Sequence, residues 1–490
     1  MKNISELKNK GLKSSAWNFL NLLTNQLRNF IVTLILARLL TPADFGLVSM
    51  AMVLNAILDF FVDFGFSSAI IRKEKITEVE TSTVFWLNIG VGGICTLLVF
   101  LCAPVFAWFY EMPQLENVVL VTSWSFFISS FGTLQTALFQ RTLNFRALFK
   151  ARLISSIASG ILGIILAICG FGVWALVFSN LLGWLFYSIS IWVMSTWRPQ
   201  FVLKLRDVSE MVSFGWKITL STLINRVFKQ MDTLIIGKIY SAASLGLFNR
   251  AQSLNLLVID YSFSSIRSVM LPTLSKLQKD EEALRYSVLK LLNVISFLTF
   301  LFSGLVYVCA DDLILLLYGN QWEGAIEIFR ILGLFSISLC LPVVFDSVMT
   351  VTNRMNMYLW SSVLRSSMLI FAIPFGIYYG LMAYVWAISI TGIIKLIPTL
   401  FTTRSCIGLP IKSQLATIIR YALPFLIPLV AWHFIMFQTE YHIINILVKG
   451  LFFTIIYVVF NFVMHNEGYA TCKGLIIQVI NKKFKRNDKI

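Results

Sequence analysis

Long apolar runs, separated by short polar segments, occupy most of the 490-residue chain. A helix that crosses a membrane needs about 20 mostly apolar residues, and fourteen runs meet this requirement. The pattern predicts spans over residues 15–37, 45–68, 83–109, 118–140, 151–170, 173–195, 214–239, 245–269, 287–309, 326–350, 358–379, 381–401, 415–437 and 443–465. Twelve spans is the alternative number, but it would leave two long apolar runs outside the membrane.

The composition excludes other broad classes of protein. Hydrophobic residues make up 58% of the chain and charged residues only 13%, where ordinary soluble domains have about 25% charged residues. The mean hydropathy is +0.80. These values exclude a soluble globular or a disordered chain, and strands of an outer-membrane barrel would alternate instead of forming long apolar runs. The chain is therefore predicted to be an all-α integral membrane protein.

The charged residues between the spans indicate on which side of the membrane each loop lies. With the amino end inside, the predicted outer loops contain no Lys or Arg apart from Arg38 and Lys238 at helix ends, whereas the inner segments are rich in both. This bias is typical of the bacterial cytoplasmic membrane and predicts that both termini are cytoplasmic. The net charge of +16 then reflects topology, and no nucleic-acid partner is expected. The outer segment 311–324, which begins with Asp311 and Asp312, is predicted to be an interfacial helix.

The sequence repeats itself with an offset of 200 residues. Residues 15–55 and 215–255 align without a gap, and 12 of 41 positions are identical. The identities include Asn25/Asn225, Thr33/Thr233, Gly46/Gly246 and Asn55/Asn255. Six predicted spans separate the two copies, and an even number gives both copies the same direction across the membrane.

The repeat predicts a domain organisation. We expect two parallel six-helix bundles around a central cleft, followed by two additional helices. The expected segments are an N-terminal bundle over 1–200, a C-terminal bundle over 201–410, two extra helices over 411–465 and a basic cytoplasmic tail over 466–490.

Signals of catalysis and of cofactor binding are missing from the sequence. The three histidines, His433, His442 and His465, have neither metal-ligand nor triad spacing, and the seven cysteines form no C-x-x-C pair. No phosphate-binding G-x-x-x-x-G-K-[ST] loop is present. The sequence therefore predicts a protein that is not an enzyme and has no metal or cofactor.

Polar residues inside the spans are the candidate functional residues, because such groups are costly in lipid and usually face a bundle interior or a wet cavity. Two polar stripes stand on corresponding helices of the repeats, the first within about 100° of a helical wheel and the second within a similar arc. They comprise Asn18, Asn21, Asn25, Arg28 and Asn29 in the first span, and Thr222, Asn225, Arg226, Lys229 and Asp232 in the seventh.

We expect these stripes to face each other and to form a cationic cavity for an anionic substrate. The candidate substrate-binding residues are Arg28, Lys229, Arg365, Asn25, Asn225 and Arg250. The alternative for basic residues near helix ends is snorkelling toward the headgroups, which is the interpretation for Arg267, Lys395 and Arg420.

Acidic residues inside the spans are candidates for binding a coupling ion. Asn55, Asp59 and Asp63 lie at i, i+4 and i+8 on one face of the second span. Asp59 is the candidate site for a proton or Na⁺. Asp63 stands near the helix end and is expected to form an ion pair with Arg72 or Lys73 instead.

Several short motifs occur in an order that resembles a known family. They are LARLLTPADFG at 36–46, D-x-G-x-x-x-A at 63–69, R-x-L-x-F at 141–145, GFGVWALV at 170–177, WRP at 197–199, LIIGKIYSAASLGLFNRA at 234–251 and YGNQWEGA at 318–325. Together they resemble the bacterial polysaccharide flippases, of the O-antigen and colanic-acid exporter type, in the multidrug/oligosaccharidyl-lipid/polysaccharide exporter superfamily. The resemblance is clearest over 10–350.

The resemblance implies a specific activity. Such proteins move a polyprenyl-diphosphate-linked oligosaccharide from the inner to the outer leaflet of the cytoplasmic (inner) membrane by alternating access. It implies that Arg28 and Lys229 bind the diphosphate, that the lipid tail stays among membrane lipids, and that a polysaccharide polymerase or glycosyltransferases are partners. The alternatives are a cation-coupled multidrug antiporter of the same superfamily, for which a mainly acidic cavity is expected, and a non-transporting scaffold of polysaccharide assembly.

Overall fold

The computed structural model describes residues 29–63, 65–208, 223, 226–434, 439–474 and 477. These residues form helices joined by short turns, and no strand occurs among them. The prediction of an all-α protein is therefore confirmed. The chain divides into two compact units, Met1–Gly246 (unit 1) and Leu247–Ile490 (unit 2).

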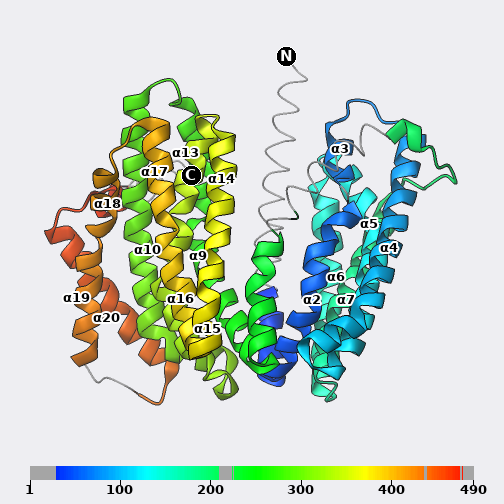
Figure 1. Cartoon of the computed structure of the whole chain (residues 1–490), viewed down its shortest axis with the longest axis horizontal. Coiled ribbons are helices and arrows are strands. Elements are labelled where there is room, and N and C mark those ends of the chain that lie inside the picture. The colour runs from blue at the N-terminus through cyan, green and yellow to red at the C-terminus, as the bar shows by residue number, and fades with distance from the viewer. Residues whose placement is uncertain are drawn as a thin grey trace, which may run out of the picture. The chain divides into compact units, whose positions relative to one another are not determined.

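Unit 1 contains long antiparallel helices joined by tight turns (Figure 1). Its elements are the helix Asn29–Leu39, α2 (Pro42–Asp63), α3 (Phe66–Arg72), α4 (Glu78–Tyr110), α5 (Pro113–Arg141), α6 (Phe145–Ile168), α7 (Val173–Met194), η1 (Leu205–Val208) and the helical residues 226–239. The start of α4 is fixed by a capping box, in which Thr77 accepts from the Glu80 backbone N–H and Glu80 accepts from that of Thr77.

Unit 2 is built around α10, the longest described helix (Figure 1). Its elements are α9 (Ala242–Lys276, which begins in unit 1), α10 (Glu281–Tyr318), η2 (Asn320–Trp322), α11 (Ala325–Leu334), α12 (Ile337–Cys340), α13 (Pro342–Val351), α14 (Met355–Ser367), η3 (Met368–Ala372), α15 (Ile373–Tyr379), α16 (Leu381–Ile394), α17 (Leu396–Ile407), α18 (Ile411–Ile419), α19 (Ala422–Phe434) and α20 (His442–Val463). Gly380 separates α15 from α16 with a φ of +90°, which favours glycine.

The packing of α4 on α5 shows how these helices suit a lipid environment. Gly92 of α4 lies so close to α5 that an added Cβ would stand 2.7 Å from Ser130 Cβ. Farther along α4, Leu101 and Trp108 are 62% and 79% exposed. Small residues at the helix contact and large apolar residues outside are expected when lipid, not water, surrounds the bundle.

Ten of the described helical segments are long and apolar enough to cross a membrane, or eleven if a bent pair counts as one span. Helix α9 is not among them, although it is 35 residues long. The first predicted span is described only from Asn29 and the seventh mainly from Arg226. A multi-pass protein is therefore confirmed, and the number fourteen stays a prediction.

One sequence-based expectation in unit 2 is wrong, and a second gains a bend. Residues 311–318 do not belong to a separate interfacial helix, because α10 continues through Asp311 and Asp312 to Tyr318. Cationic partners compensate the charges of both acidic residues inside this helix, as described below. The predicted span 326–350 corresponds to a bent pair of helical segments, with 56° between α11 and Ile337–Val351.

The repeat-related asparagines Asn55 and Asn255 make equivalent contacts. The Asn55 side chain on α2 donates to the Thr122 carbonyl and the Ser125 hydroxyl of α5, at 3.2 and 3.0 Å. The Asn255 side chain on α9 donates to a carbonyl at the end of α11 and accepts from the Ser336 hydroxyl. In each repeat the asparagine therefore joins the second predicted span to the fourth, which supports the parallel repeat.

Candidate functional site

The predicted coupling residue Asp59 lies among other polar groups of unit 1. Asp59 and Asp63 are both partly buried on α2, and the Arg226 guanidinium interacts electrostatically with Asp59. The same guanidinium donates to the Ala56 carbonyl at 3.0 Å. The structure therefore brings Asp59 together with a cation from the seventh predicted span, which the sequence did not pair with it.

Asp63 has a different partner from the one expected. Its carboxylate accepts hydrogen bonds from the Ser67 backbone N–H at 3.1 Å and from the Ser67 hydroxyl at 2.5 Å, at the start of α3. Lys73 forms its ion pair with Glu80, at 2.6 Å. The predicted pairing of Asp63 with Lys73 is therefore wrong. Helix α2 ends at Asp63 and α3 begins at Phe66, and the Asp63 carboxylate accepts from a backbone N–H in the first turn of α3.

Lys229 is exposed on the helical residues 226–239 of unit 1. The same helix holds Lys238, whose ammonium pairs with the Glu111 carboxylate at 2.8 Å. This ion pair lowers the pKa of Glu111, because its carboxylate accepts a hydrogen bond from Lys238. Both lysines are exposed, and Lys238 in addition attaches its helix to the end of α4 through the pair with Glu111. Of the other predicted residues, Arg28, Asn25 and Asn225 lie outside the described part of the chain.

Arg365 is held by an acid within unit 2. Its guanidinium on α14 donates to both carboxylate oxygens of Asp346 on α13, at 2.8 and 3.2 Å. The side chains of Arg365 and Asp346 are 13% and 28% exposed. A bidentate pair of this kind neutralises both charges. An anion that binds Arg365 must therefore compete with Asp346.

We expect substitutions of this pair to separate folding from substrate binding. Arg365→Gln alone leaves a partly buried carboxylate without its cation and should lower the amount of folded protein. The double variant Arg365→Gln/Asp346→Asn removes both charges and should restore that amount. If Arg365 also binds substrate, the double variant stays defective in export. Membrane abundance measures the first effect, and surface polysaccharide, the product that the sequence resemblance implies, measures the second; restored export would indicate a purely structural pair.

Arg250 lies near the start of α9, partly buried. The hydroxyl of the buried Tyr318, at the end of α10, is close enough for an electrostatic interaction with it. Arg250 and Arg365 both belong to unit 2, but they lie on different helices and have different partners.

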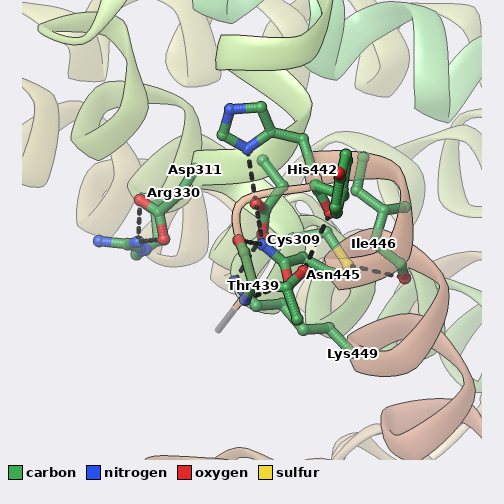
Figure 2. A network of polar contacts seen from close by, with 10 residues as sticks. Cys309, Asp311, Arg330, Thr439, His442, Asn445, Ile446 and Lys449 are labelled. Carbon is green, nitrogen blue, oxygen red and sulfur yellow. Dashed lines mark hydrogen bonds and ion pairs between the residues drawn. The ribbon is translucent and has the colours of Figure 1, made fainter. Parts of the chain in front are cut away.

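A buried ionic network joins α10 to α20 (Figure 2). Asp312 of α10 is 2% exposed and Lys449 of α20 is 7% exposed, and their charged atoms are 2.6 Å apart. The Asp312 carboxylate also contacts His442 Nδ1 at 2.9 Å and accepts from the Asn445 side chain at 3.0 Å. Figure 2 shows His442, Asn445 and Lys449 gathered on one side, while Arg330 faces Asp311 on the other.

Sequence reasoning missed this network. It placed Asp312 in an outer loop and left Lys449 without a role, although a lysine inside an apolar span was a signal for a buried partner. Both charges are compensated, so the network can hold the hairpin of α19 and α20 on α10. Tyr421, just before α19, makes a second attachment to α10 nearer its other end. Its hydroxyl donates to Asn293 of α10 and accepts from the Gly468 N–H, both at 2.9 Å.

Known proteins resemble the chain in sequence. Residues 35–327 match the family model described as "Polysaccharide biosynthesis protein". An "uncharacterized membrane protein in cps region" of Klebsiella pneumoniae is 30% identical over 336 residues, which are 66% of this chain and 68% of that protein. The teichuronic acid biosynthesis protein TuaB of Bacillus subtilis (strain 168) is 27% identical over 374 residues, 75% of this chain and 76% of that protein.

Solved structures resemble the chain in fold. The lipid II flippase MurJ, in an inward closed conformation, matches with a TM-score of 0.73 and 17% identity over 92% of this chain and 99% of that chain. An inward-facing multidrug resistance MATE family transporter matches with a TM-score of 0.64 and 16% identity over 79% of this chain and 95% of that one. The fold is thus that of the MurJ and MATE transporters. Because the family model covers more than half of the residues, the chain belongs to the polysaccharide biosynthesis protein family, as its motifs indicated.

Proposed function

We propose that the protein is a flippase for bacterial surface polysaccharide biosynthesis. It moves a polyprenyl-diphosphate-linked oligosaccharide from the inner to the outer leaflet of the cytoplasmic membrane by alternating access. The observation that carries this proposal is that a chain of a polysaccharide biosynthesis family has the fold of a lipid II flippase. Its polysaccharide-related relatives, among them a teichuronic acid biosynthesis protein, support the same class of substrate.

The diphosphate is the part of this substrate with the largest free-energy cost of transfer into lipid, because an unpaired anion is strongly unfavourable in a medium of low dielectric. The exposed Lys229 offers a cation for it, and charge-assisted hydrogen bonds to phosphate oxygens are strong. We assign Arg28, Asn25 and Asn225 to the same site by their sequence positions, and Arg365 and Arg250 as further cations. The lipid tail stays in the bilayer.

The driving force follows from the charge of the substrate and from the acids of unit 1. Moving one negative charge outward from a negative cytoplasm is favourable by about 2.3 kcal/mol per 100 mV. Asp59, beside Arg226, is the proposed site where a proton or Na⁺ competes with the guanidinium. In this scheme both termini are cytoplasmic, the two six-helix bundles are 1–200 and 201–410, and a polymerase or glycosyltransferases act alongside the protein.

The charges inside the described helices do not favour the multidrug antiporter. An organic cation needs acids that are available to it. Asp59, Asp312 and Asp346 each lie beside an arginine or lysine, and the Asp63 carboxylate accepts hydrogen bonds from Ser67. A scaffold without transport has no need of a transporter fold with an internal repeat. The flippase proposal accounts for both the transporter fold and the internal repeat.

Lipid analysis of a strain that lacks the gene tests the proposal. We expect intact polyprenyl-diphosphate-linked repeat units to accumulate while the surface polysaccharide disappears, and their mass identifies the sugar. A strain without a second exporter is the required background. Unchanged amounts of intermediate and polymer in that background would contradict the flippase proposal and favour the antiporter.

A further inference from the structure

The segment that follows α7 lies against the start of α4 (Figure 1). We call residues 197–206 the strap. The carbonyl of Gln200 accepts from Trp86 Nε1 of α4 at 2.9 Å, and the backbone N–H of Lys204 donates to the Thr83 hydroxyl at 3.1 Å. These hydrogen bonds fix the place of the strap on α4.

Both ends of the strap are packed into unit 1. At the first end, Trp197 makes an edge-to-face contact with the buried Phe85 of α4, with ring centroids 5.7 Å apart. Just beyond the other end, Val208 is fully buried in an apolar cluster that also contains Phe66 of α3. Because both ends are anchored, the fold sets which way the residues between them face.

The middle of the strap exposes large apolar side chains. Phe201 is 92% exposed, Leu203 58% and Leu205 56%. Alternate residues of an extended chain point to the same side, so Phe201 and Leu203 present one apolar face, which Leu205 continues at the start of η1. Contact of this face with water is unfavourable, and the clustering of its side chains indicates a binding partner.

The helix beneath the strap indicates that this partner is lipid. Trp86, Leu97, Leu101 and Trp108 of α4 are separated by nearly whole helical turns, so they lie along one side of the helix. Leu97, Leu101 and Trp108 are 58%, 62% and 79% exposed, as expected of side chains that face lipid. Phe201 stacks on Trp86, with ring centroids 5.2 Å apart. The strap therefore covers the end of the lipid-facing side of α4.

The same helix gives the depth of the strap in the membrane. Trp86 and Trp108 are separated by 22 positions in the sequence, which is about 33 Å along a helix and close to the roughly 30 Å of a bilayer's hydrocarbon core. Tryptophan is enriched at both membrane–water interfaces. Trp108 then lies at one interface, and Trp86 with Phe201 lies at the other, which is the cytoplasmic one in the proposed topology.

The charge of the strap favours one kind of lipid. All charged residues between 197 and 206 are basic and exposed: Arg198, Lys204 and Arg206. Two acids stand nearby, Glu78, which accepts from the Gln200 amide at 2.9 Å, and Asp207 in η1, and they leave the sum positive. Basic residues next to apolar ones are typical of segments that lie in the interface and attract anionic headgroups.

We propose that the strap is a membrane-surface anchor that binds anionic phospholipids, those of the inner leaflet in the proposed topology. Phe201, Leu203 and Leu205 enter the boundary between headgroups and acyl chains, and Lys204 contacts lipid phosphate. The strap follows the last helix of the first predicted bundle, so the anchor holds the connection between the bundles at the membrane surface. This inference needs only a protein inserted in a membrane, whether or not it is a flippase.

Quenching of a fluorophore on Leu203→Cys tests the anchor in the full-length protein. The seven native cysteines are replaced, and the protein is placed in phospholipid nanodiscs, which leave both membrane faces open to solvent. We expect quenching by lipids that carry a spin label near the headgroup end of the acyl chain. Aqueous iodide should quench several-fold less than at Glu74→Cys, an exposed position in the loop before α4.

Equal iodide quenching at the two positions would overturn the proposal and would favour a protein partner for the strap. Leu205→Cys gives the same readout if Leu203→Cys does not yield folded protein. Neither measurement needs a lipid-linked sugar, so a failure of the flippase proposal remains separate.

The lipid composition tests the preference for anionic headgroups. Protection of the fluorophore from iodide should be greater in nanodiscs that contain phosphatidylglycerol than in phosphatidylcholine alone, and Lys204→Gln should reduce this difference. Lys75→Gln, at an exposed lysine in the loop before α4, is the matched control and should leave the difference unchanged. Equal protection in both compositions would overturn the assignment of an anionic lipid.

Discussion

Replacing Lys229 with alanine is expected to remove most polysaccharide export while the protein stays in the membrane at normal amounts. Lys229 is exposed, so its loss breaks no buried pair. A hydrogen bond to a charged group contributes about 1.5–3 kcal/mol, and about 1.4 kcal/mol is tenfold in a rate. We therefore expect transport to fall roughly ten- to hundredfold. Lys229→Arg, which keeps the charge, should retain most of the activity.

The measurement compares surface polysaccharide and accumulated lipid-linked intermediate in the deletion strain carrying each variant. Lys238→Ala is the matched control on the same helix, because this lysine forms an exposed pair with Glu111 that contributes about 1 kcal/mol or less. It should export normally. Equal export by the Lys229 and Lys238 variants would remove Lys229 from the diphosphate site.

Replacing Lys449 with methionine is expected to cause the largest loss of stability. Asp312 and Lys449 are both nearly inaccessible, and breaking a buried ion pair by removing one partner costs about 3–5 kcal/mol, because the remaining charge has no compensation. The hairpin of α19 and α20 should then detach from α10. Thermal unfolding of the purified protein in detergent, with the amount of folded protein in the membrane, measures the effect.

The control for this prediction is Lys412→Met, which removes an exposed lysine at the start of α18 and should change stability little. The double variant Asp312→Asn/Lys449→Met removes both charges of the pair and should recover much of the loss. A Lys449 variant as stable as the Lys412 variant would show that the network does not hold the hairpin.

The predicted helices follow from local sequence, whereas the ionic partners do not. Apolar runs and turn residues suffice to predict a helix, since a chain in lipid must satisfy its backbone groups internally. Asp312 and Lys449 are 137 residues apart, and a pattern read along the chain gives no distance between them. The acidic pair at 311 and 312 also lowers local hydropathy, so the sequence predicts that the span ends at residue 309, before the end of α10.

The repeat was the most informative long-range signal in the sequence. It pairs Asn55 with Asn255 and Gly46 with Gly246 from the sequence alone, and the structure gives each pair equivalent contacts. It did not indicate that Asp346 neutralises Arg365, because the two polar residues stand in separate spans with many alternatives for a partner. The repeat therefore predicts which residues occupy equivalent positions, but it does not predict which side chains form ion pairs.

Transport by the purified protein in liposomes tests the central claim most directly. The lipid-linked intermediate from the deletion strain is placed in both leaflets, and a soluble enzyme outside the vesicles modifies only the sugars it can reach. Our account predicts that vesicles with the protein lose the protected, inner-leaflet share of the substrate, whereas vesicles with the Lys229→Ala variant keep most of it. An equal protected share in vesicles with and without correctly inserted protein would contradict the flippase function.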